Sequence, residues 1–286
     1  MLDISNSRLR SLKEVNILED ITKLDCSNNK IETLEGIEKC INLTKLNCGN
    51  NELETLEGLE KCVNLTELFC SGNKLKTLKG IEKCINLTEL DCWNNILESL
   101  EGIEKCVKLT GLYCGNNKLE TLEGLNKCVN LTILYCSSNE LETLEGLNKC
   151  VNLTKLNCGD NKLKTLKGIE KCVNLTKLYC YENKIEKLEG LERCINLTDL
   201  NFNNNKIKTL EGIEKCNNLI ELYCKNNELK RLKYCPESIE YIKYNDNPID
   251  FEYRYRNIGE INSINKGRWE RSIYKEVMEE DDIIFI

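Results

Sequence analysis

Apolar residues recur along most of the chain with one fixed period. A leucine marks this 22-residue period without a slip, at Leu2, Leu24, Leu46, Leu68, Leu90, Leu112, Leu134, Leu156, Leu178, Leu200 and Leu222. Such regular self-similarity indicates a repeat array in which each unit packs only against its neighbours. The hydrophobic pattern therefore predicts a solenoid.

Each repeat divides into two halves with different periods. In the first half, Leu46 and Cys48 alternate with other residues, which is typical of a short β-strand with one buried face. In the second half apolar residues fall three apart, at Leu56, Leu59, Cys62 and Leu65. This is the spacing of a tight 3-10 turn, and Gly58 allows the backbone a positive φ at the corner. Each repeat is thus predicted to form one coil.

The repeat reads L-x-x-L-x-C-x-x-N-x-L-x-x-L-x-G-L/I and resembles the leucine-rich repeat, with cysteine at its third inner position. Its length and its Leu/Ile-Glu-Gly-Leu/Ile segment are similar to the bacterial internalins and to the class of nuclear phosphatase regulatory subunits. The resemblance implies an α/β fold: a right-handed, horseshoe-shaped solenoid with a concave parallel sheet of about 12 short strands, 3-10 or irregular coils on the convex side, and a C-terminal cap. The Asn-, Lys-, Ile- and Glu-rich composition is also similar to repeat proteins of giant viruses and AT-rich protists.

The expected domains are a solenoid over residues 1–249, with about 11–12 coils, and a capping segment or tail over residues 250–286. The first coil is degenerate, because Val15, Leu18 and Ile21 take the places of the later Ile, Cys and Leu. By this alignment Leu18 should be buried like Cys40. Near the other end, the step from Leu222 to Ile242 is shorter than the period of the other repeats.

Residues 250–286 lose the period. Trp269, Ile273 and Val277 in this segment fit one face of a helix. We expect the segment to cover the last coil, and a docking tail is the alternative.

The 19 cysteines form two ladders and leave Cys235 over. One ladder is Cys26, Cys48, Cys70, Cys92, Cys114, Cys136, Cys158, Cys180 and Cys224, with Phe202 in the missing rung. The other is Cys40, Cys62, Cys84, Cys106, Cys128, Cys150, Cys172, Cys194 and Cys216. Both ladders occupy buried apolar positions, so cysteine is expected to act as a small hydrophobe with a free thiol. Free thiols favour a reducing compartment, cytoplasmic or nuclear, or the host cytoplasm if the protein is viral.

An asparagine closes the strand half of each repeat and is predicted to be structural. The predicted ladder is Asn29, Asn51, Asn73, Asn95, Asn117, Asn139, Asn161, Asn183, Asn205 and Asn227. An inward amide at this place can bond backbone groups of its own coil and of the adjacent coil, which no regular secondary structure would satisfy.

Charge and motifs argue against several functions. The net charge is −7, with basic and acidic residues mixed in every repeat, so no basic stripe for nucleic acid is expected. No apolar stretch is long enough to span a membrane, and we expect no signal peptide. The chain has no histidine and none of the common nucleotide, hydrolase or zinc motifs, so we expect no enzymatic activity, metal or cofactor. A monomer is expected.

The outward residues of the strands should form columns on the concave face, where variable residues would carry specificity. An aromatic and apolar cluster is predicted across four consecutive coils, at Phe69, Trp93, Tyr113, Ile133 and Tyr135, with Tyr179 and Tyr181 farther along. The acidic residues Glu67, Glu89 and Asp91 border this patch, and Lys155 and Lys177 mark a change of sign. Patches of this kind mark interaction sites, although strand positions also favour aromatic residues for sheet packing alone.

The function predicted from these features is a non-catalytic scaffold that binds a protein or peptide on its concave face, with Trp93 and Tyr113 as anchors. The first alternative, which the phosphatase-class resemblance allows, is a regulatory subunit of an enzyme such as a protein phosphatase. The second alternative is a store of metal or redox equivalents in the cysteine ladders.

Overall fold

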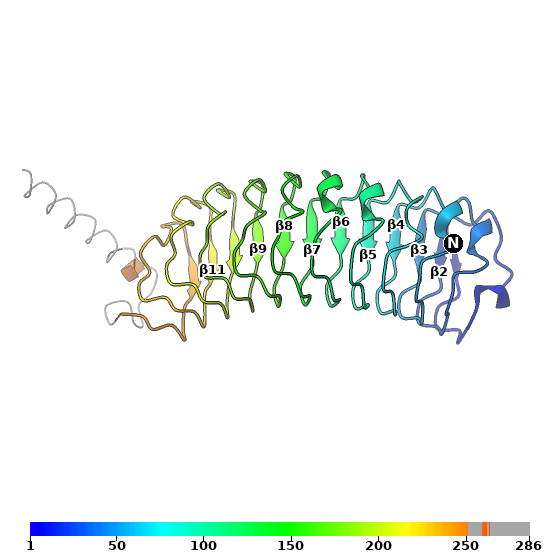
Figure 1. The fold of residues 1–286 in the computed structure, drawn as a ribbon, viewed down its shortest axis with the longest axis horizontal. Coiled ribbons are helices and arrows are strands. Elements are labelled where there is room, and N and C mark those ends of the chain that lie inside the picture. The colour runs from blue at the N-terminus through cyan, green and yellow to red at the C-terminus, as the bar shows by residue number, and fades with distance from the viewer. Residues whose placement is uncertain (251–258, 262, 264–286) are drawn as a thin grey trace, which may run out of the picture.

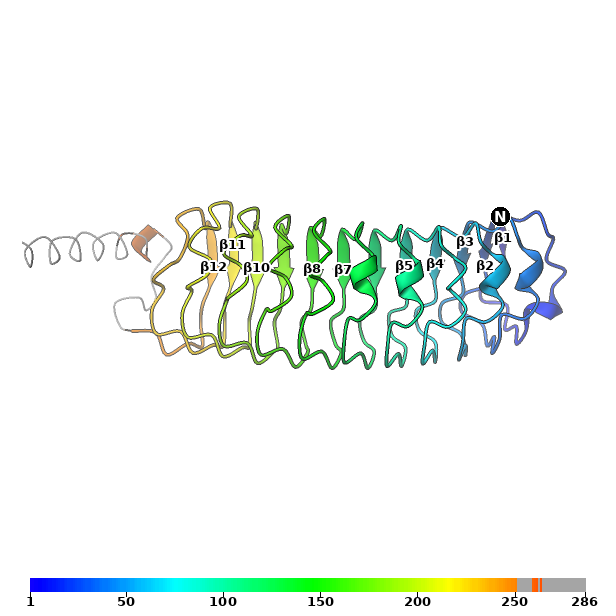
Figure 2. The ribbon, with the colours of Figure 1, turned by 45° about the horizontal axis from the view of Figure 1, so that its top comes forward.

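The computed structural model describes residues 1–250, 259–261 and 263. The described part of the chain contains one parallel sheet of 12 strands, whose order in the sheet is their order in the sequence. Figures 1 and 2 show the strands side by side along one elongated solenoid, each joined to the next by a return segment. The predicted leucine-rich-repeat solenoid is confirmed.

The strands are short because each coil gives only its first half to the sheet. They are β1 (Leu2–Asp3), β2 (Lys23–Asp25), β3 (Lys45–Asn47), β4 (Glu67–Phe69), β5 (Glu89–Asp91), β6 (Gly111–Tyr113), β7 (Ile133–Tyr135), β8 (Lys155–Asn157), β9 (Lys177–Tyr179), β10 (Asp199–Asn201), β11 (Glu221–Tyr223) and β12 (Tyr241–Lys243). The marker leucines pair across the strands, as Leu46 does with Leu68. The last pair is Leu222 with Ile242, which confirms the shortened final step.

Five of the return segments contain a 3-10 helix. They are η1 (Leu12–Glu14), η2 (Ile37–Lys39), η3 (Leu59–Lys61), η4 (Ile103–Lys105) and η5 (Leu125–Lys127). Gly58, directly before η3, has a φ of +107°. At Gly80, its equivalent one coil later, an added Cβ would lie 2.3 Å from the carbonyl oxygen of Leu56. The positive φ confirms the predicted glycine corner, and at Gly80 the two coils also approach too closely for a side chain.

Leucine, isoleucine and cysteine side chains form one continuous buried cluster along the solenoid. All 19 cysteines are buried and free. Phe202, in the missing rung of the first ladder, is fully buried as well. The prediction that cysteine serves here as a small core hydrophobe with a free thiol is confirmed.

The first coil differs from the prediction. Leu18 was expected in the core, but it is 59% exposed, and Ile17 is buried in its place at 3%. The later coils turn at a glycine, whereas the first coil has Glu14 at that position. Its 3-10 helix therefore forms earlier in the coil, where Ser11 accepts from the backbone N–H of Lys13 and Glu14 completes a capping box. This earlier turn leaves Ile17 facing inward.

The described residues beyond 250 are few. Ile261 is fully buried and belongs to the hydrophobic core cluster. The predicted helical face of Trp269, Ile273 and Val277 lies outside the described residues. Capping by residues 250–286 therefore stays a prediction.

Candidate functional site

The concave face is the solvent side of the sheet, and its residues flank the inner leucine of each strand. In β6 the central Leu112 is buried, whereas Tyr113 beside it is only partly buried. The other strands from β3 to β11 repeat this arrangement, with a buried centre between two partly exposed residues. The sheet thus presents two parallel columns of side chains to solvent.

The predicted patch residues lie on four neighbouring coils, but they do not form one stack of rings. Tyr113 and Tyr135 meet edge to face, with ring centroids 5.4 Å apart. Phe69 instead contacts the ammonium group of Lys45, which lies 4.7 Å from its ring centroid. Gly111 carries no side chain beside Ile133, and the ring of Tyr113 lies next to it, 3.6 Å from the position that a Cβ would take. The apolar centre of the face is therefore Tyr113, Ile133 and Tyr135.

Trp93 lies flat on the neighbouring coil, and its role as an anchor stays a prediction. A Cβ added to Gly115 would come within 2.2 Å of the indole ring, so the ring lies against the backbone of the next coil. Tyr181 covers Gly159 in the same way, at 2.5 Å. In both cases the glycine and the aromatic residue are 22 residues apart, so they occupy the same position in neighbouring coils. This pairing of a glycine with an aromatic residue is visible in the sequence, but it was not used to predict how the rings pack.

The charged residues around the apolar centre fall into paired and unpaired groups. Lys45 pairs with Glu67 at 2.6 Å, and Lys177 pairs with Asp199 at 3.1 Å. Among the described residues, Glu89, Asp91 and Lys155 form no ion pair. Two free carboxylates therefore lie on one side of the apolar centre and one free ammonium group on the other.

Two tyrosines of the predicted patch, Tyr113 and Tyr179, have perturbed acidity. Burial, followed by the negative charge of Glu89, raises the pKa of the Tyr113 phenol. Burial is also the main cause of the raised pKa of Tyr179. Both phenols stay neutral at physiological pH and can donate or accept hydrogen bonds there.

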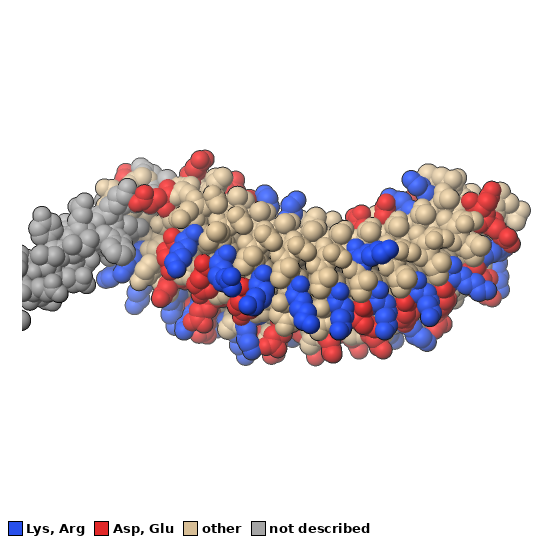
Figure 3. Space-filling model, turned by 90° about the horizontal axis from the view of Figure 1, so that it is seen from above, with Lys and Arg blue, Asp and Glu red and all other residues tan. Residues whose placement is uncertain are grey.

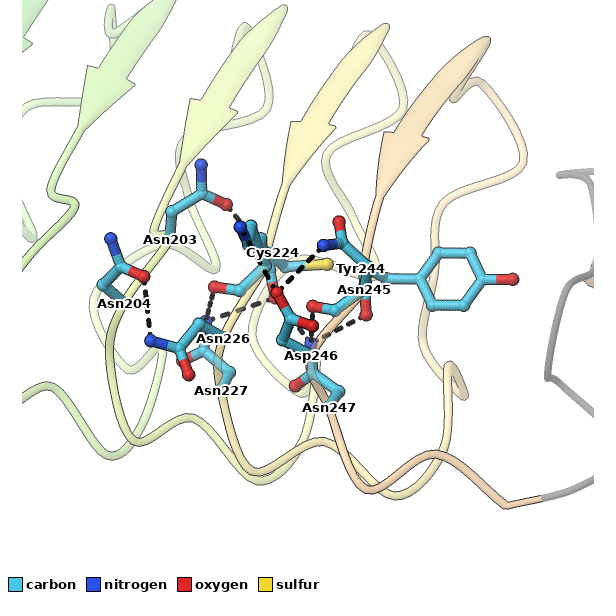
Figure 4. A network of polar contacts seen from close by, with 10 residues as sticks. Asn203, Asn204, Cys224, Asn226, Asn227, Tyr244, Asn245, Asp246 and Asn247 are labelled. Atoms are coloured by element: carbon cyan, nitrogen blue, oxygen red, sulfur yellow. Dashed lines mark hydrogen bonds and ion pairs between the residues drawn. The ribbon is translucent and has the colours of Figure 1, made fainter.

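The asparagine ladder lies along one edge of the sheet and bonds only backbone groups. Asn117 donates from Nδ2 to the carbonyl oxygens of Cys92, Cys114 and Gly115, each at 3.1 Å. Its Oδ1 accepts from the backbone N–H of Leu97 at 2.9 Å. The other ladder residues repeat this pattern, and Figure 4 shows its end at Asn227 and Asn247. Each amide therefore ties its own coil to the preceding one.

The cysteine ladders have no reactive character. Burial raises the pKa of the Cys158 thiol to about 12 and that of the Cys70 thiol well above its ordinary value. Thiolates are the reactive and metal-binding form, and burial suppresses them here. In the described part of the chain, no three cysteine or acidic residues are grouped so that they could hold a metal ion.

The structure aligns basic residues that the sequence analysis did not single out. One lysine or arginine per coil lines up on the side of the solenoid where each return segment leads into its strand, which we call the strand-start flank. The row is Lys39, Lys61, Lys83, Lys105, Lys127, Lys149, Lys171, Arg193 and Lys215. The signal was the repeat spacing itself, since residues one period apart must stack in space. The row is not apparent from the charge of a single repeat, because each repeat also contains acidic residues.

Grooves accompany this flank and do not lie over the aromatic residues. Two open grooves of about 890 and 590 Å³ run along threonine and asparagine columns between the concave face and the basic row. They meet at Lys108, which lines both. The part of the chain that the structure describes has no helix long and apolar enough to cross a bilayer.

These features define a solenoid repeat protein with a structural amide ladder and a variable concave face. The family profile "Leucine Rich repeats (2 copies)" matches residues 19–61, 63–105, 107–149 and 151–193, which is more than half of the chain. The chain therefore belongs to the leucine-rich repeat family, whose fold is typical of protein–protein interaction scaffolds. A comparison with curated protein sequences found no match.

Solved structures share the fold at low sequence identity. An internalin, InlF from Listeria monocytogenes, is 18% identical with a TM-score of 0.67, over 83% of this chain and 78% of that one. YopM, a leucine-rich effector protein from Yersinia pestis, is 25% identical with a TM-score of 0.70, over 87% and 66%. The plant peptide hormone receptor RGFR1 in complex with RGF2 is 24% identical with a TM-score of 0.65, over 79% and 43%.

Proposed function

We propose that the protein is a non-catalytic scaffold that binds a protein or peptide segment on its concave face over β4 to β8. The observation that carries the proposal is the partly exposed apolar centre of Tyr113, Ile133 and Tyr135, bordered by charged groups that have no ion-pair partner among the described residues. Partly exposed tyrosines are frequent binding anchors, because they bury a large area at little entropic cost.

The arrangement of charge also defines what would fit. Adjacent strands lie about 4.8 Å apart, so Glu89 and Lys155 are separated by three strand spacings, or about 14 Å. An extended segment of about four or five residues spans this distance. It would place a basic side chain over Glu89 and Asp91, apolar side chains over the tyrosines, and an acidic side chain over Lys155.

Support also comes from the family. The leucine-rich-repeat fold generally serves non-catalytic interaction scaffolds, and the similar structure of RGFR1 was solved in complex with RGF2. Fold alone does not determine function, so the proposal rests on the particular residues of this concave face.

The test is peptide selection followed by matched substitutions. Peptides selected from a displayed random library on the intact protein would be measured by calorimetry against the wild type, Y113A/Y135A and Y223A/Y241A. The last variant is the control, because Tyr223 and Tyr241 also form a ring pair on this face, at 5.5 Å, outside the patch. We expect Y113A/Y135A to weaken binding by about 2 kcal/mol or more and the control to bind like the wild type. Equal binding by all three proteins would eliminate this site.

We also propose that the protein works in a reducing compartment. The support is that all 19 thiols are free and fill the core, where their oxidation would add polar atoms or bonds that the packing does not accommodate.

A further inference from the structure

The basic row on the strand-start flank projects into solvent. All nine of its residues, from Lys39 to Lys215, are exposed. None of them takes part in an ion pair within the described part of the chain. The glutamate that precedes most of them turns back to its own coil, as Glu60 does by accepting from the backbone N–H of Gly58 at 2.9 Å. The cationic groups, eight ammonium groups and the guanidinium of Arg193, therefore project from the solenoid without an ion-pair partner in the described part of the chain.

An aliphatic row runs beside the basic row. It consists of Ile41, Val63, Ile85, Val107, Val129, Val151, Val173 and Ile195, one residue per coil in eight consecutive coils. Seven of these side chains are 42–52% exposed, and Val173 is half-buried. A contiguous exposed apolar strip of this kind usually marks an interaction surface.

Seven of the eight backbone carbonyls of the aliphatic row already accept a hydrogen bond from an asparagine side chain. Asn64 Nδ2 donates to the carbonyl oxygen of Ile41 at 2.9 Å, and Asn152 Nδ2 donates to that of Val129 at 3.1 Å. Equivalent bonds reach five further carbonyls of the row. Burial of the row therefore does not leave these carbonyl acceptors unpaired. Unpaired buried carbonyls would oppose burial.

The two rows form a long, level surface. At about 4.8 Å per coil, nine basic residues extend over about 38 Å. In Figure 1 the upper ends of the coils, where the strands begin, lie at nearly one height. Figure 3 views this side and shows a row of lysine and arginine side chains next to a broad band that is almost free of charge.

We propose that the strand-start flank binds the surface of an anionic lipid bilayer, with the basic row among the headgroups and the aliphatic row at their boundary with the acyl chains. A basic face next to exposed aliphatic side chains is the pattern of surfaces that lie on membranes. A bilayer offers both chemistries at every point along the two rows, whereas a nucleic acid offers phosphates and base faces suited to aromatic stacking, not a continuous apolar layer for the aliphatic row.

A second copy of the chain fits this flank poorly. Seen from this side, the solenoid is curved along its length (Figure 3). Two such curved surfaces overlap over their full length only when the two-fold axis runs perpendicular to the rows. In that arrangement the basic row of one copy faces the basic row of the other. Like charges opposed along the whole interface disfavour such a dimer.

Near the middle of the row, two basic residues have no glutamate directly before them in the sequence. Asn126 and Asn148 stand where most other coils have the glutamate, next to Lys127 and Lys149. The charge-reversal variant K127E/K149E therefore addresses the strongest part of the surface. K118E/K184E is the matched control, since it makes the same change in charge at two exposed lysines that lie outside the row and form no ion pair in the described part of the chain.

The experiment is cosedimentation of the full chain with vesicles of phosphatidylcholine alone or with about 30% phosphatidylserine. We expect binding only to the anionic vesicles, and its loss when salt rises from about 50 to about 500 mM. K127E/K149E should bind at least tenfold more weakly and K118E/K184E like the wild type. V129S/V151S, which alters only the aliphatic row, should bind at least threefold more weakly, and all variants should melt like the wild type.

Three results would overturn the proposal. The first is no binding to anionic vesicles at low salt. The second is equal loss in K127E/K149E and in the control, which would mean that net charge alone matters. The third is wild-type binding by V129S/V151S together with tight binding of a single-stranded DNA oligonucleotide that K127E/K149E abolishes, which would assign the flank to nucleic acid.

Discussion

The interior and the concave face of this solenoid are built from the same strands but obey different rules. Interior columns hold nearly one residue type throughout, such as the leucines stacked from Leu24 to Leu222, because each must fit the identical coil on either side. Concave columns change from strand to strand, as at Asp91, Tyr113 and Asn157. The difference shows that stacking constrains one side of each strand and leaves the other free to carry specificity.

The largest expected effect is a loss of folding stability at alkaline pH, which arises from the buried thiols of the interior. Burial raises the pKa of the Cys158 thiol from 9.0 to about 12. Between these values the unfolded chain loses thiol protons that the folded chain keeps, so stability is intact below pH 9 and falls as pH rises toward 12. Each such thiol costs on the order of 1 kcal/mol per pH unit in this window, and the ladders add many of them.

We therefore expect alkaline unfolding in one cooperative step. Far-ultraviolet circular dichroism and thiolate absorbance, followed together from pH 8 upward, should change at the same pH. Thiolate formation while the sheet signal persists would mean that the interior thiols ionise within the fold, and the distinction between interior and surface would fail for them.

The next effect compares two neighbours in β6. Leu112→Ala should lower the free energy of unfolding by about 2–5 kcal/mol, because Leu112 is fully buried between identical leucines. Tyr113→Ala should cost about 1 kcal/mol, chiefly through the edge-to-face contact with Tyr135. Urea unfolding of the two variants measures both values. Similar losses for both would show that the concave ring is as structural as the core leucine.

The smallest effect tests the amide ladder against its exposed neighbour. Asn117→Leu should cost about 1–3 kcal/mol, because four hydrogen bonds to backbone groups are lost. Asn116→Gly should be nearly neutral, since Asn116 is exposed and has a φ of +51° that glycine adopts freely. Thermal melts of the two variants decide the matter, and an unchanged melt for Asn117→Leu would refute the structural role of the ladder.

The repeat made most of the fold predictable. A fixed period determines which residues stack, so strands, glycine corners, buried cysteines and the shortened final step all followed from spacing alone. The prediction failed where the repeat itself fails, at Leu18, because a coil without the corner glycine turns at another residue. The sequence analysis also did not predict the left-handed backbone conformation of the residue before each ladder asparagine, such as Asn28 and Glu182. No single residue type occupies that position in all repeats.

The candidate site was less predictable for a different reason. Spacing places a side chain in a column, but it does not say onto which neighbour the side chain folds. Trp93 and Tyr181 lie over glycines of adjacent coils in opposite directions along the chain. The basic row was missed because it emerges only when coils are aligned, and the acidic residues within each repeat conceal it in any local average.

The reach of the asparagine ladder has a consequence for how such a protein can change in size. Every ladder amide bonds its own coil and the one before it, so each coil supplies the same set of donors and acceptors at both of its junctions. Loss or duplication of one complete repeat therefore joins surfaces that already match. The array can therefore change in length by whole coils, and each such change inserts or removes a complete position on the concave face without rebuilding the interior.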